Sequence, residues 1–374
     1  MLNSLKKFFA GIFLILIVAS TLYVVIHREK IIRMEEDPSQ FHEAMYYDKL
    51  LGNMVQCRLC PNQCVLAPGQ YGICKARKNI NGKLYSMVYG KIAAAHIDPI
   101  EKKPFFHVLP GAKAFSIATT GCNIQCLFCQ NWEISQVFPF DAATQFATPE
   151  DVVRQAVLSG SQAIAFTYSE PVISYEYVLD IAKLAKRAGL KTLMVSNAFI
   201  EQKPLKELLP FIDAFKVDLK GFDDSFYHKL TQGRLQPVLE SMKTIKQSGV
   251  WLEVVNLLVT NQNDSDEKIR NLSLWVKNNL GDDTPLHFSR FSPQYKMLNV
   301  PPTPEETVIR ARAIANQAGL KYVYTGNIVY PPGEITYCPA SKEEIIVRQG
   351  MFLASNGLKD GACSDGEKIP GVWN

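Results

Sequence analysis

Three cysteines stand close together in the first half of the chain, at Cys122, Cys126 and Cys129. Their spacing is C-x3-C-x2-C. A cubane [4Fe–4S] cluster normally takes four thiolates, one on each iron. Three thiolates leave one iron open to a small molecule, so the pattern indicates a cluster that does chemistry. Zinc ribbons favour two separate cysteine pairs, and a disulfide trio would leave one thiol over.

Four further cysteines lie within eighteen residues upstream, at Cys57, Cys60, Cys64 and Cys74. Such a group in a short segment predicts a metal site. Its C-x2-C-x3-C-x9-C spacing matches neither common ferredoxin pattern. Structural zinc and a second iron–sulfur cluster both remain open, and the Pro and Gly content of a small knuckle favours zinc.

Apolar runs alternate with helical segments from about residue 112 onward. This alternation predicts a parallel sheet with right-handed crossovers, either a partial (β/α)6 barrel or an open doubly wound sheet. In both folds ligands gather at the carboxyl ends of the strands, so the residues just after each strand are binding candidates. The predicted strands are 114–119, 162–167, 191–196, 214–219, 251–259, 286–291 and 322–325.

Helix boundaries are also visible in the sequence. The segment 148–151 (TPED) combines an N-cap threonine, a proline in the first turn and an acid three residues after the cap. The segment 303–306 (TPEE) repeats this signal. Glycines are expected to end four of the helices in the manner of C-caps. They are Gly160, Gly189, Gly249 and Gly319.

Several phrases together resemble the radical S-adenosylmethionine (SAM) enzymes. The chain looks closest to the radical SAM member of the AmmeMemoRadiSam system, which is similar to pyruvate formate-lyase activating enzymes. The phrases are CRLCP (57–61), DPIEKKP (98–104), the cysteine segment 121–135, TYSEP (167–171), VDLKG (217–221) and PLHFSRF (285–291). The resemblance implies a partial (β/α)6 TIM-like barrel and a [4Fe–4S] cluster on Cys122, Cys126 and Cys129. It further implies reductive cleavage of SAM to a 5′-deoxyadenosyl radical, which abstracts hydrogen from a substrate.

The residues after the second and third predicted strands are candidates for binding SAM. Ser169 and Glu170 belong to the TYSEP phrase, and the carboxylate suits the amino group of SAM. Glu170 could instead be a helix-start acid that meets the helix dipole. Asn197 suits a ribose or the methionine carboxylate. The family usually carries Thr-Asn-Gly here, and the change to Ala198 leaves any requirement for a positive φ in doubt.

The later strands contribute three more candidates. Asp218 suits a ribose hydroxyl, and Lys220 suits the methionine carboxylate. These two residues lie two apart on an extended chain, so a simple salt bridge is the alternative. His287 can bond the ribose or adenine, although a lone histidine is often a satisfied structural residue.

The segment from Phe8 to Ile26 has no charged residue and is long enough to span a bilayer as a helix. We expect a single-pass membrane anchor with a cytoplasmic catalytic part, because an oxidising compartment would drive the cysteines toward disulfides. A signal peptide cleaved near Val18-Ala19-Ser20 is the alternative.

The C-terminal tail, residues 331–374, is expected to be a degenerate zinc ribbon. Related sequences tend to carry two C-x2-C pairs there, as in a zinc ribbon. Here Cys338 and Cys363 remain, with Ser341 and Gly366 in place of their partners, so we expect the tail to have lost its metal. The expected parts are a membrane anchor (1–30), a linker (31–52), a Cys-rich region (53–109), a radical SAM core barrel (110–330) and the tail (331–374).

The sequence thus predicts a radical SAM oxidoreductase whose substrate is a protein glycine or a small molecule. Its expected partners are the membrane, through residues 8–26, and a reductant such as a ferredoxin or flavodoxin. The net charge of +4 over 374 residues, without a long block of one sign, predicts no nucleic-acid partner. An alternative of a different class is a secreted binding protein structured by zinc or disulfides.

Overall fold

The computed structural model describes residues 38–374. The chain divides into two units, residues 1–42 and 43–374. Of the first unit, the described part is a 3-10 turn, Pro38–Gln40, and the first residue of the short strand β1, His42–Glu43. The second unit holds the elements that position the site.

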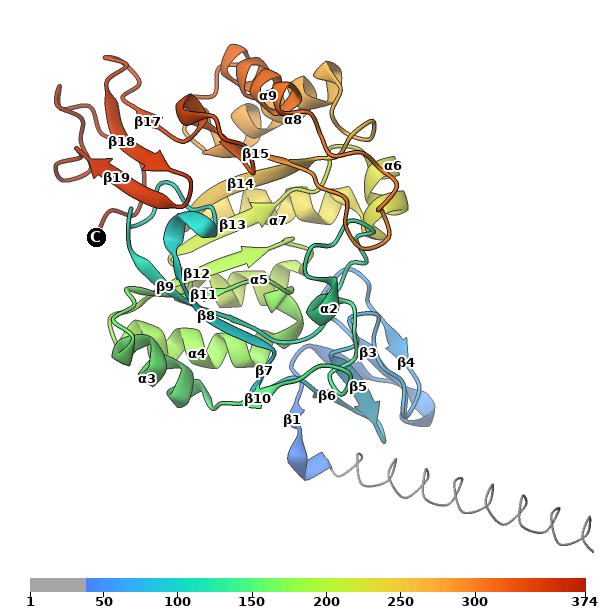
Figure 1. Cartoon of the computed structure of the whole chain (residues 1–374). Helices are drawn as coiled ribbons and strands as arrows, with labels where there is room; N and C mark the ends of the chain where they lie inside the picture. The colour runs from blue at the N-terminus through green and yellow to red at the C-terminus, as the bar shows by residue number, and fades with distance from the viewer. Residues whose placement is uncertain (1–37) are drawn as a thin grey trace, which may run out of the picture. The chain divides into compact units, whose positions relative to one another are not determined.

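Within the described residues, an eight-stranded sheet forms the framework of the second unit (Figure 1). Seven of its described strands run parallel in the order of the sequence, and β8 pairs antiparallel with β9 at one edge. Because the strand order never reverses, right-handed crossovers put the connecting helices on one face. The strands are β8 (Ala94–Pro99), β9 (Lys113–Ala118), β11 (Ala163–Phe166), β12 (Lys191–Ser196), β13 (Ala214–Asp218), β14 (Trp251–Leu258), β15 (Leu286–Arg290) and β16 (Val323–Gly326).

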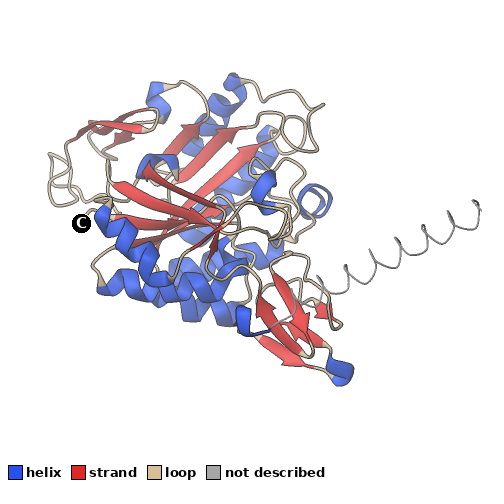
Figure 2. Ribbon diagram, turned by 60° about the horizontal axis from the view of Figure 1, so that its bottom comes forward, coloured by secondary structure: helices blue, strands red, loops and turns tan. Residues whose placement is uncertain are grey.

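The long helices pack along the outer side of this curved sheet (Figure 2). In α4, for example, the buried residues Val178, Ile181, Ala182 and Ala185 recur at helical spacing and form the face toward the sheet. The long helices are α3 (Pro149–Leu158), α4 (Tyr175–Arg187), α5 (Gln202–Leu208), α7 (Leu235–Gln247), α8 (Asp266–Leu280) and α9 (Glu305–Gln317), and the short ones are α2 (Trp132–Ser135) and α6 (Asp224–Phe226).

The bottom of the barrel is filled by the segment between β8 and β9. Phe105 and Val108 are fully buried there against small strand residues such as Ala163 and Ala214. The small side chains of the strands leave room for this plug, since interiors are filled to a constant density. Space is therefore left only toward the carboxyl ends of the strands.

All seven predicted strands are present, and the sequential order excludes the doubly wound alternative. The partial barrel is therefore confirmed as the fold. The antiparallel strand β8 was not predicted. Its exposed residues include His96 and Ile97, so it lacks the continuous apolar run of the parallel strands.

Of the two predicted helix starts, the structure confirms one and contradicts the other. Thr148 caps α3 in a complete capping box with Asp151, as predicted. The prediction for Thr303 is wrong, because Pro304 occupies the cap position and the Thr303 hydroxyl donates to the carbonyl oxygen of Leu258 at 2.6 Å. The four predicted C-terminal glycines all have positive φ, between 67° and 94°.

Small sheets flank the barrel at both ends of the described chain. Strands β2 (Tyr47–Lys49), β3 (Val55–Cys57) and β4 (Val65–Leu66) form one, and β5 (Arg77–Ile80) pairs with β6 (Lys83–Ser86). β7 (Lys91–Ile92) pairs with β10 (Gln145–Phe146). The tail forms a sheet of β17 (Thr336–Tyr337), β18 (Glu344–Gln349) and β19 (Phe352–Asn356).

The fold prediction needs one correction, which concerns the N-terminal transmembrane helix. In residues 38–374 no helix combines the length and the apolar character needed to cross a bilayer. The predicted span, residues 8–26, lies outside the described residues. The structure therefore gives no support to a membrane-spanning element in this fold.

Candidate active site

The cysteine loop connects β9 with α2 and is fixed by backbone contacts. Gly121 has φ 107°, and a Cβ there would lie 2.4 Å from the carbonyl oxygen of Cys74, so only glycine fits. The amide of Gln125 donates to the carbonyl of Thr231 at 2.7 Å, and that of Leu127 to Leu230 at 2.9 Å. These bonds tie the loop to the segment that follows α6.

A cavity of about 820 Å³ opens at the carboxyl ends of the strands. It is lined by the three loop cysteines and by all six residues that the sequence named as SAM-binding candidates. The structure therefore brings nine residues from six loops and strands to one place. They are Cys122, Cys126, Cys129, Ser169, Glu170, Asn197, Asp218, Lys220 and His287.

Among the described residues, the three thiols of the loop do not all lie within 4.8 Å of one another. A tetrahedral zinc ion needs sulfurs about 3.8 Å apart, given Zn–S bonds of about 2.3 Å. In the described residues, ligand atoms of three Cys, His, Asp or Glu residues all come within 4.8 Å of one another at Cys363, Asp365 and Glu367, and not in the loop. The loop cysteines are also free of disulfides. Burial raises the pKa of the Cys126 thiol to about 12, so cluster binding has to displace its proton.

Glu170 is buried at the junction of β11 and β12. Its carboxylate accepts hydrogen bonds from the Ser196 hydroxyl at 2.6 Å, the Asn197 amide at 2.9 Å and the Val172 amide at 3.0 Å. Burial raises its pKa to about 7. Through the bond from the Val172 amide, Glu170 caps the 3-10 turn Pro171–Ser174. The helix-start role that was considered as an alternative is therefore present as well. The other carboxylate oxygen of Glu170 still has a lone pair for a ligand.

Two neighbours of Glu170 are held by short bonds. The Ser169 hydroxyl donates to the carbonyl oxygen of Thr119 at 2.6 Å. The Asn197 side chain donates to the Asn123 side-chain oxygen at 2.9 Å and lies 3.8 Å from the Cys122 sulfur. Ala198 has φ 54°, so the positive φ is kept although glycine is absent. A left-handed alanine costs about 1–2 kcal/mol.

Asp218 lies between two lysines at the end of β13. Lys220 Nζ is 2.9 Å from its Oδ2, and Lys216 pairs with its Oδ1. Burial alone would raise the pKa of Asp218, but the two ammonium groups hold it below its usual range. The salt bridge raised as an alternative for Asp218 and Lys220 is therefore present. Both side chains still line the cavity.

His287 reaches the floor of the cavity from β15. Its Nε2 lies 2.8 Å from Oε2 of Glu253, which is fully buried and also accepts from the amides of Phe106 and His107. Burial lowers the pKa of His287, so the ring is neutral at pH 7. This bond is the satisfied structural role considered for a lone histidine, and the ring also borders the cavity.

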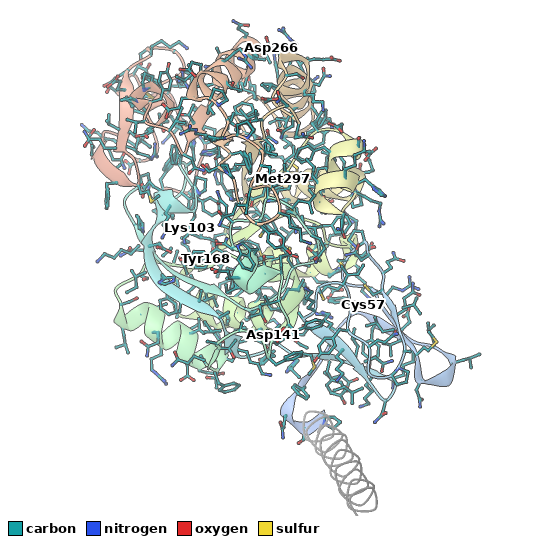
Figure 3. The ribbon with its side chains drawn as sticks, turned by 45° about the vertical axis from the view of Figure 1, so that its right-hand side comes forward. Cys57, Lys103, Asp141, Tyr168, Asp266 and Met297 are labelled. Atoms are coloured by element: carbon teal, nitrogen blue, oxygen red, sulfur yellow. A yellow bond between two sulfur atoms is a disulfide. The ribbon has the colours of Figure 1, made fainter. Side chains whose placement is uncertain are left out.

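The sequence reasoning missed several charged residues of this site. Lys216 and Glu253 lie inside strands. The sequence feature that could have revealed them is a charged residue within a mostly apolar strand. Lys103 lines the cavity beside Tyr168, whose hydroxyl lies 3.2 Å from its Nζ (Figure 3). Lys103 also pairs with Asp98 at 2.5 Å, and burial lowers its pKa to about 8. Its phrase was recognised in the sequence, but no role was given to it.

Comparison with known proteins identifies the superfamily to which this chain belongs. Residues 116–273 match the model of the radical SAM superfamily. An uncharacterized protein of Methanocaldococcus jannaschii, MJ0808, is 46% identical over 297 residues, which cover 79% of this chain and 88% of that protein. The chain belongs to the radical SAM superfamily.

Several more distant relatives are named as activating enzymes. The pyruvate formate-lyase 1-activating enzyme of Escherichia coli (strain K12) is 22% identical over 223 residues, covering 54% of this chain and 89% of that enzyme. A solved domain of a pyruvate formate-lyase-activating enzyme from Bacteroides vulgatus overlays with a TM-score of 0.39 at 15% identity, covering 45% of this chain and all of that one. The sequence similarity relates this radical SAM enzyme to activating enzymes, while the narrower AmmeMemoRadiSam resemblance stays a prediction.

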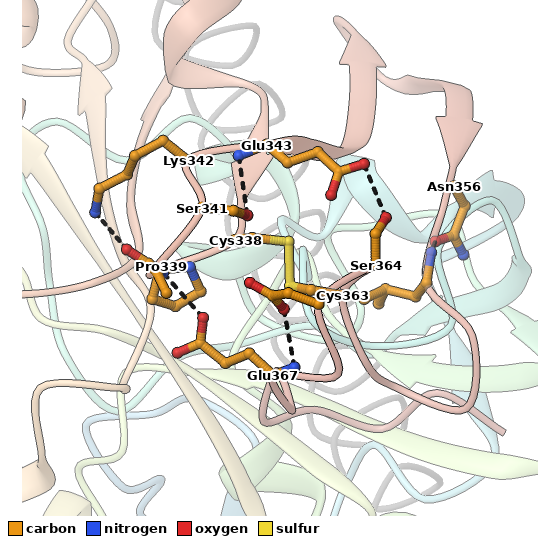
Figure 4. The surroundings of a disulfide bond; sticks show 12 residues. Cys338, Pro339, Ser341, Lys342, Glu343, Asn356, Cys363, Ser364 and Glu367 are labelled. Atoms are coloured by element: carbon orange, nitrogen blue, oxygen red, sulfur yellow. Dashed lines mark hydrogen bonds between the residues drawn. A yellow bond between two sulfur atoms is a disulfide. The ribbon is translucent and has the colours of Figure 1, made fainter.

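Membership of the radical SAM superfamily implies a [4Fe–4S] cluster and SAM as cofactors, and it favours an enzyme over the alternative of a binding protein structured by zinc or disulfides. The other six cysteines form two groups, one of free thiols and one joined by a disulfide. Cys57, Cys60, Cys64 and Cys74 are free and line a second, small cavity. Cys338 and Cys363 form a disulfide in the tail (Figure 4).

Proposed function

We propose that Cys122, Cys126 and Cys129 hold a [4Fe–4S] cluster and that the enzyme uses it to cleave SAM reductively and abstract hydrogen from a substrate. The observation that carries this proposal is one cavity lined by three free thiols and by the six side chains predicted to bind SAM. Three thiolates match a cube with one open iron. When bound, the cluster supplies the electron that breaks a carbon–sulfur bond of SAM.

The chain's own residues bind and orient the cofactor in this proposal. Glu170 and Lys220 offer opposite charges for the amino and carboxylate groups of SAM. Asp218 stays ionised between its lysines and can accept a ribose hydroxyl. The walls of the cavity limit water around the reacting atoms, which suppresses side reactions of a radical.

For the substrate we propose a backbone glycine of a partner protein, with a flavodoxin- or ferredoxin-type reductant. Support comes from relatives named as activating enzymes, including that of Clostridium pasteurianum, which is 26% identical over 165 residues. A small molecule is the second candidate, because a cavity of about 820 Å³ lies within the usual range of small-molecule sites.

The cleavage proposal is tested by anaerobic reconstitution with iron and sulfide. We expect about four irons at this site and formation of 5′-deoxyadenosine after addition of SAM and dithionite. The variant C122A/C126A/C129A should form none, whereas C338A/C363A, which removes only the tail disulfide, should retain it. A correctly formed cluster without 5′-deoxyadenosine would overturn the proposal.

The substrate is tested separately. Incubation with candidate glycyl-radical proteins should give the doublet of a glycyl radical in electron paramagnetic resonance (EPR) spectra. If 5′-deoxyadenosine forms but every protein candidate stays radical-free while a small molecule is consumed, the second candidate replaces the first.

A further inference from the structure

Four lysines line the cavity, and the proposed function uses one of them, Lys220. Lys102 and Lys103 belong to the segment that follows β8, and Lys216 lies within β13. Lysine side chains are almost never buried in a protein unless they are paired. Each of these charges therefore needs a partner, either in the chain or in a ligand.

Two aspartates each pair with two of these lysines. Lys103 Nζ lies 2.5 Å from Oδ2 of Asp98, and Lys102 Nζ lies 2.8 Å from Oδ1 of the same carboxylate. We call these three residues the Asp98 triad. Asp218 is shared by Lys216 and Lys220 in the same way, and these form the Asp218 triad. Each triad has two ammonium groups and one carboxylate, so each carries one positive charge in excess.

The other acidic side chains that line the cavity do not remove this excess. Glu305 pairs with Arg290 at 3.4 Å. The positive charge of Arg348 acts on Glu101, which lies 3.9 Å from its Nε, and on Glu334. These acids serve cations outside the two triads. The excess positive charge of the triads is therefore left for ligands.

SAM satisfies only one of the two triads. In the proposed function its amino group meets Glu170 and its one carboxylate meets Lys220 of the Asp218 triad. SAM has no second anionic group for the Asp98 triad. The cavity of about 820 Å³ is near the upper end of the range for a site that holds one small molecule, so part of a second ligand fits beside SAM.

Lys103 is the cation that this second ligand would meet. Its side chain lines the cavity and is only 2% exposed. Burial lowers its pKa to about 8 although Asp98 opposes the shift, and the charges of Lys102 and Lys216 lower it further. An added anion would favour the charged form of this lysine. A carboxylate carries the one unit of negative charge that the Asp98 triad lacks.

Tyr168 connects Lys103 to the cysteine loop. It has φ 65°, which is rare for a bulky residue, and its carbonyl oxygen accepts from the Asn131 side chain of that loop at 2.8 Å. The ring centroid lies 4.3 Å from Lys103 Nζ, and the hydroxyl donates to Asp98 (Figure 3). Strain of this kind clusters at ligand sites. Glu170 follows two residues later, so a group bound by Lys103 would lie beside the SAM site.

We propose that Lys103, with the charges of Lys102 and Lys216 in support, binds a carboxylate of the substrate and orients the substrate beside SAM. This inference rests on the proposed function and names the class of its substrate, which is an acid. The carboxylate belongs either to a free small acid or to an acidic side chain next to the target glycine of a partner protein. Both sources present the same group to the same ammonium.

Isothermal titration calorimetry of the reconstituted enzyme in excess SAM tests the site with butyrate as the probe. We expect one butyrate per chain to bind with a Kd of about 1–10 mM, and its neutral analogue butyramide to bind at least about tenfold more weakly. Butyramide keeps the shape of butyrate but has no charge. Equal affinities for butyrate and butyramide, or no binding of either, would overturn the proposal without the need for any variant.

Substitutions then locate the binding. Lys103→Met should raise the Kd for butyrate by about tenfold or more, and Lys103→Arg, which keeps the charge, should keep it within about threefold of wild type. Lys83→Met is the matched control, because it breaks only an exposed pair with Glu43 at 3.0 Å, and it should leave the Kd unchanged. A Lys103→Met protein with the wild-type Kd would contradict the assignment to this lysine.

A second pair of probes identifies the source of the carboxylate. They are the blocked peptides acetyl-Gly-Glu-Gly-amide and acetyl-Gly-Gln-Gly-amide. A glutamate peptide that binds more tightly than butyrate assigns the carboxylate to a partner protein, and tighter binding of butyrate assigns it to a free acid. Formation of 5′-deoxyadenosine by wild type is measured separately. Butyrate binding that depends on Lys103 without this product would contradict the proposed function alone, whereas product with binding independent of Lys103 would contradict the carboxylate site alone.

Discussion

Asp218 shows how one carboxylate organises the charges of this site. It pairs with two ammonium groups, of which Lys216 is almost completely buried and Lys220 borders the cavity. A buried charge without its partner is costly, so each lysine depends on this aspartate. Asp218 and Lys220, which are proposed to bind SAM, therefore also balance charge inside the fold.

Asp218→Asn should lower the free energy of unfolding by about 2–3 kcal/mol, because it leaves two lysines close together without a countercharge. Denaturant unfolding of the apoprotein measures this. The matched control is Asp266→Asn, which breaks the exposed pair with Arg310 (Figure 3 labels Asp266) and should cost less than about 1 kcal/mol. Equal losses in the two variants would contradict the argument.

At the residue scale the sequence predicted most of the site. Asp218, Lys220 and Glu170 stand at the carboxyl ends of strands or a few residues beyond them, where parallel sheets place ligands, and all three line the cavity. Glu253 was missed because it lies in the interior of a strand. Its importance comes from the amides of Phe106 and His107, more than 140 residues away in sequence, and no local pattern reveals such a contact.

At the scale of elements, the cysteine loop depends on the close approach of two backbones. Gly121 touches the carbonyl oxygen of Cys74, so this loop is built on the segment that carries the four upstream cysteines. A side chain at this position would push the two segments apart. A substitution of Gly121 should therefore disturb the cysteine loop although it removes no thiol.

Gly121→Ala should lower the free energy of unfolding by about 2–5 kcal/mol, from a backbone clash and an unfavourable φ together. Gly160→Ala is the matched control, because Gly160 also has positive φ but a Cβ there meets nothing within 4 Å. It should cost about 1 kcal/mol. Thermal unfolding and iron content after reconstitution check both variants, and a Gly121→Ala protein with wild-type values would refute the close-approach argument.

The parallel strands were predictable because most of their residues are apolar and each run is followed by a polar segment or a helix signal. The order of these strands was not predictable, since a barrel and a doubly wound sheet share the same local pattern. The plug of Phe105 and Val108 was also invisible, because its partners are small residues such as Ala163 on distant strands. Contacts between residues far apart in the sequence therefore select the barrel, which the local sequence pattern could not distinguish from a doubly wound sheet.

At the scale of the whole molecule, His107 fastens the C-terminal segment to the barrel. Its ring is fully buried, with Nδ1 2.7 Å from the carbonyl oxygen of Pro370 and Nε2 2.7 Å from the Tyr324 hydroxyl. The Val372 amide donates to the carbonyl oxygen of His107 at 2.8 Å. The end of the described chain is therefore bonded to the segment that plugs the sheet.

Acid should weaken this attachment. Burial lowers the pKa of His107 to about 4. The folded state then binds fewer protons than the unfolded state between pH 6.5 and 4, so stability is lost as pH falls through this range. Each pKa unit is worth about 1.4 kcal/mol, so wild type should lose up to about 3 kcal/mol more than His107→Gln on going from pH 7 to pH 4. Denaturant unfolding at both pH values measures the difference, and parallel losses in the two proteins would exclude His107 as the cause.

The disulfide between Cys338 and Cys363 has a practical consequence for anyone who purifies this enzyme. Both cysteines are buried, so the oxygen-free, thiol-rich buffers that protect iron–sulfur cofactors would reduce this cystine when the tail opens. Closing a loop of this size contributes about 3 kcal/mol in typical proteins. A sample prepared for spectroscopy can therefore melt earlier than one prepared in air, and a comparison of the two needs the state of this bond to be assayed in each.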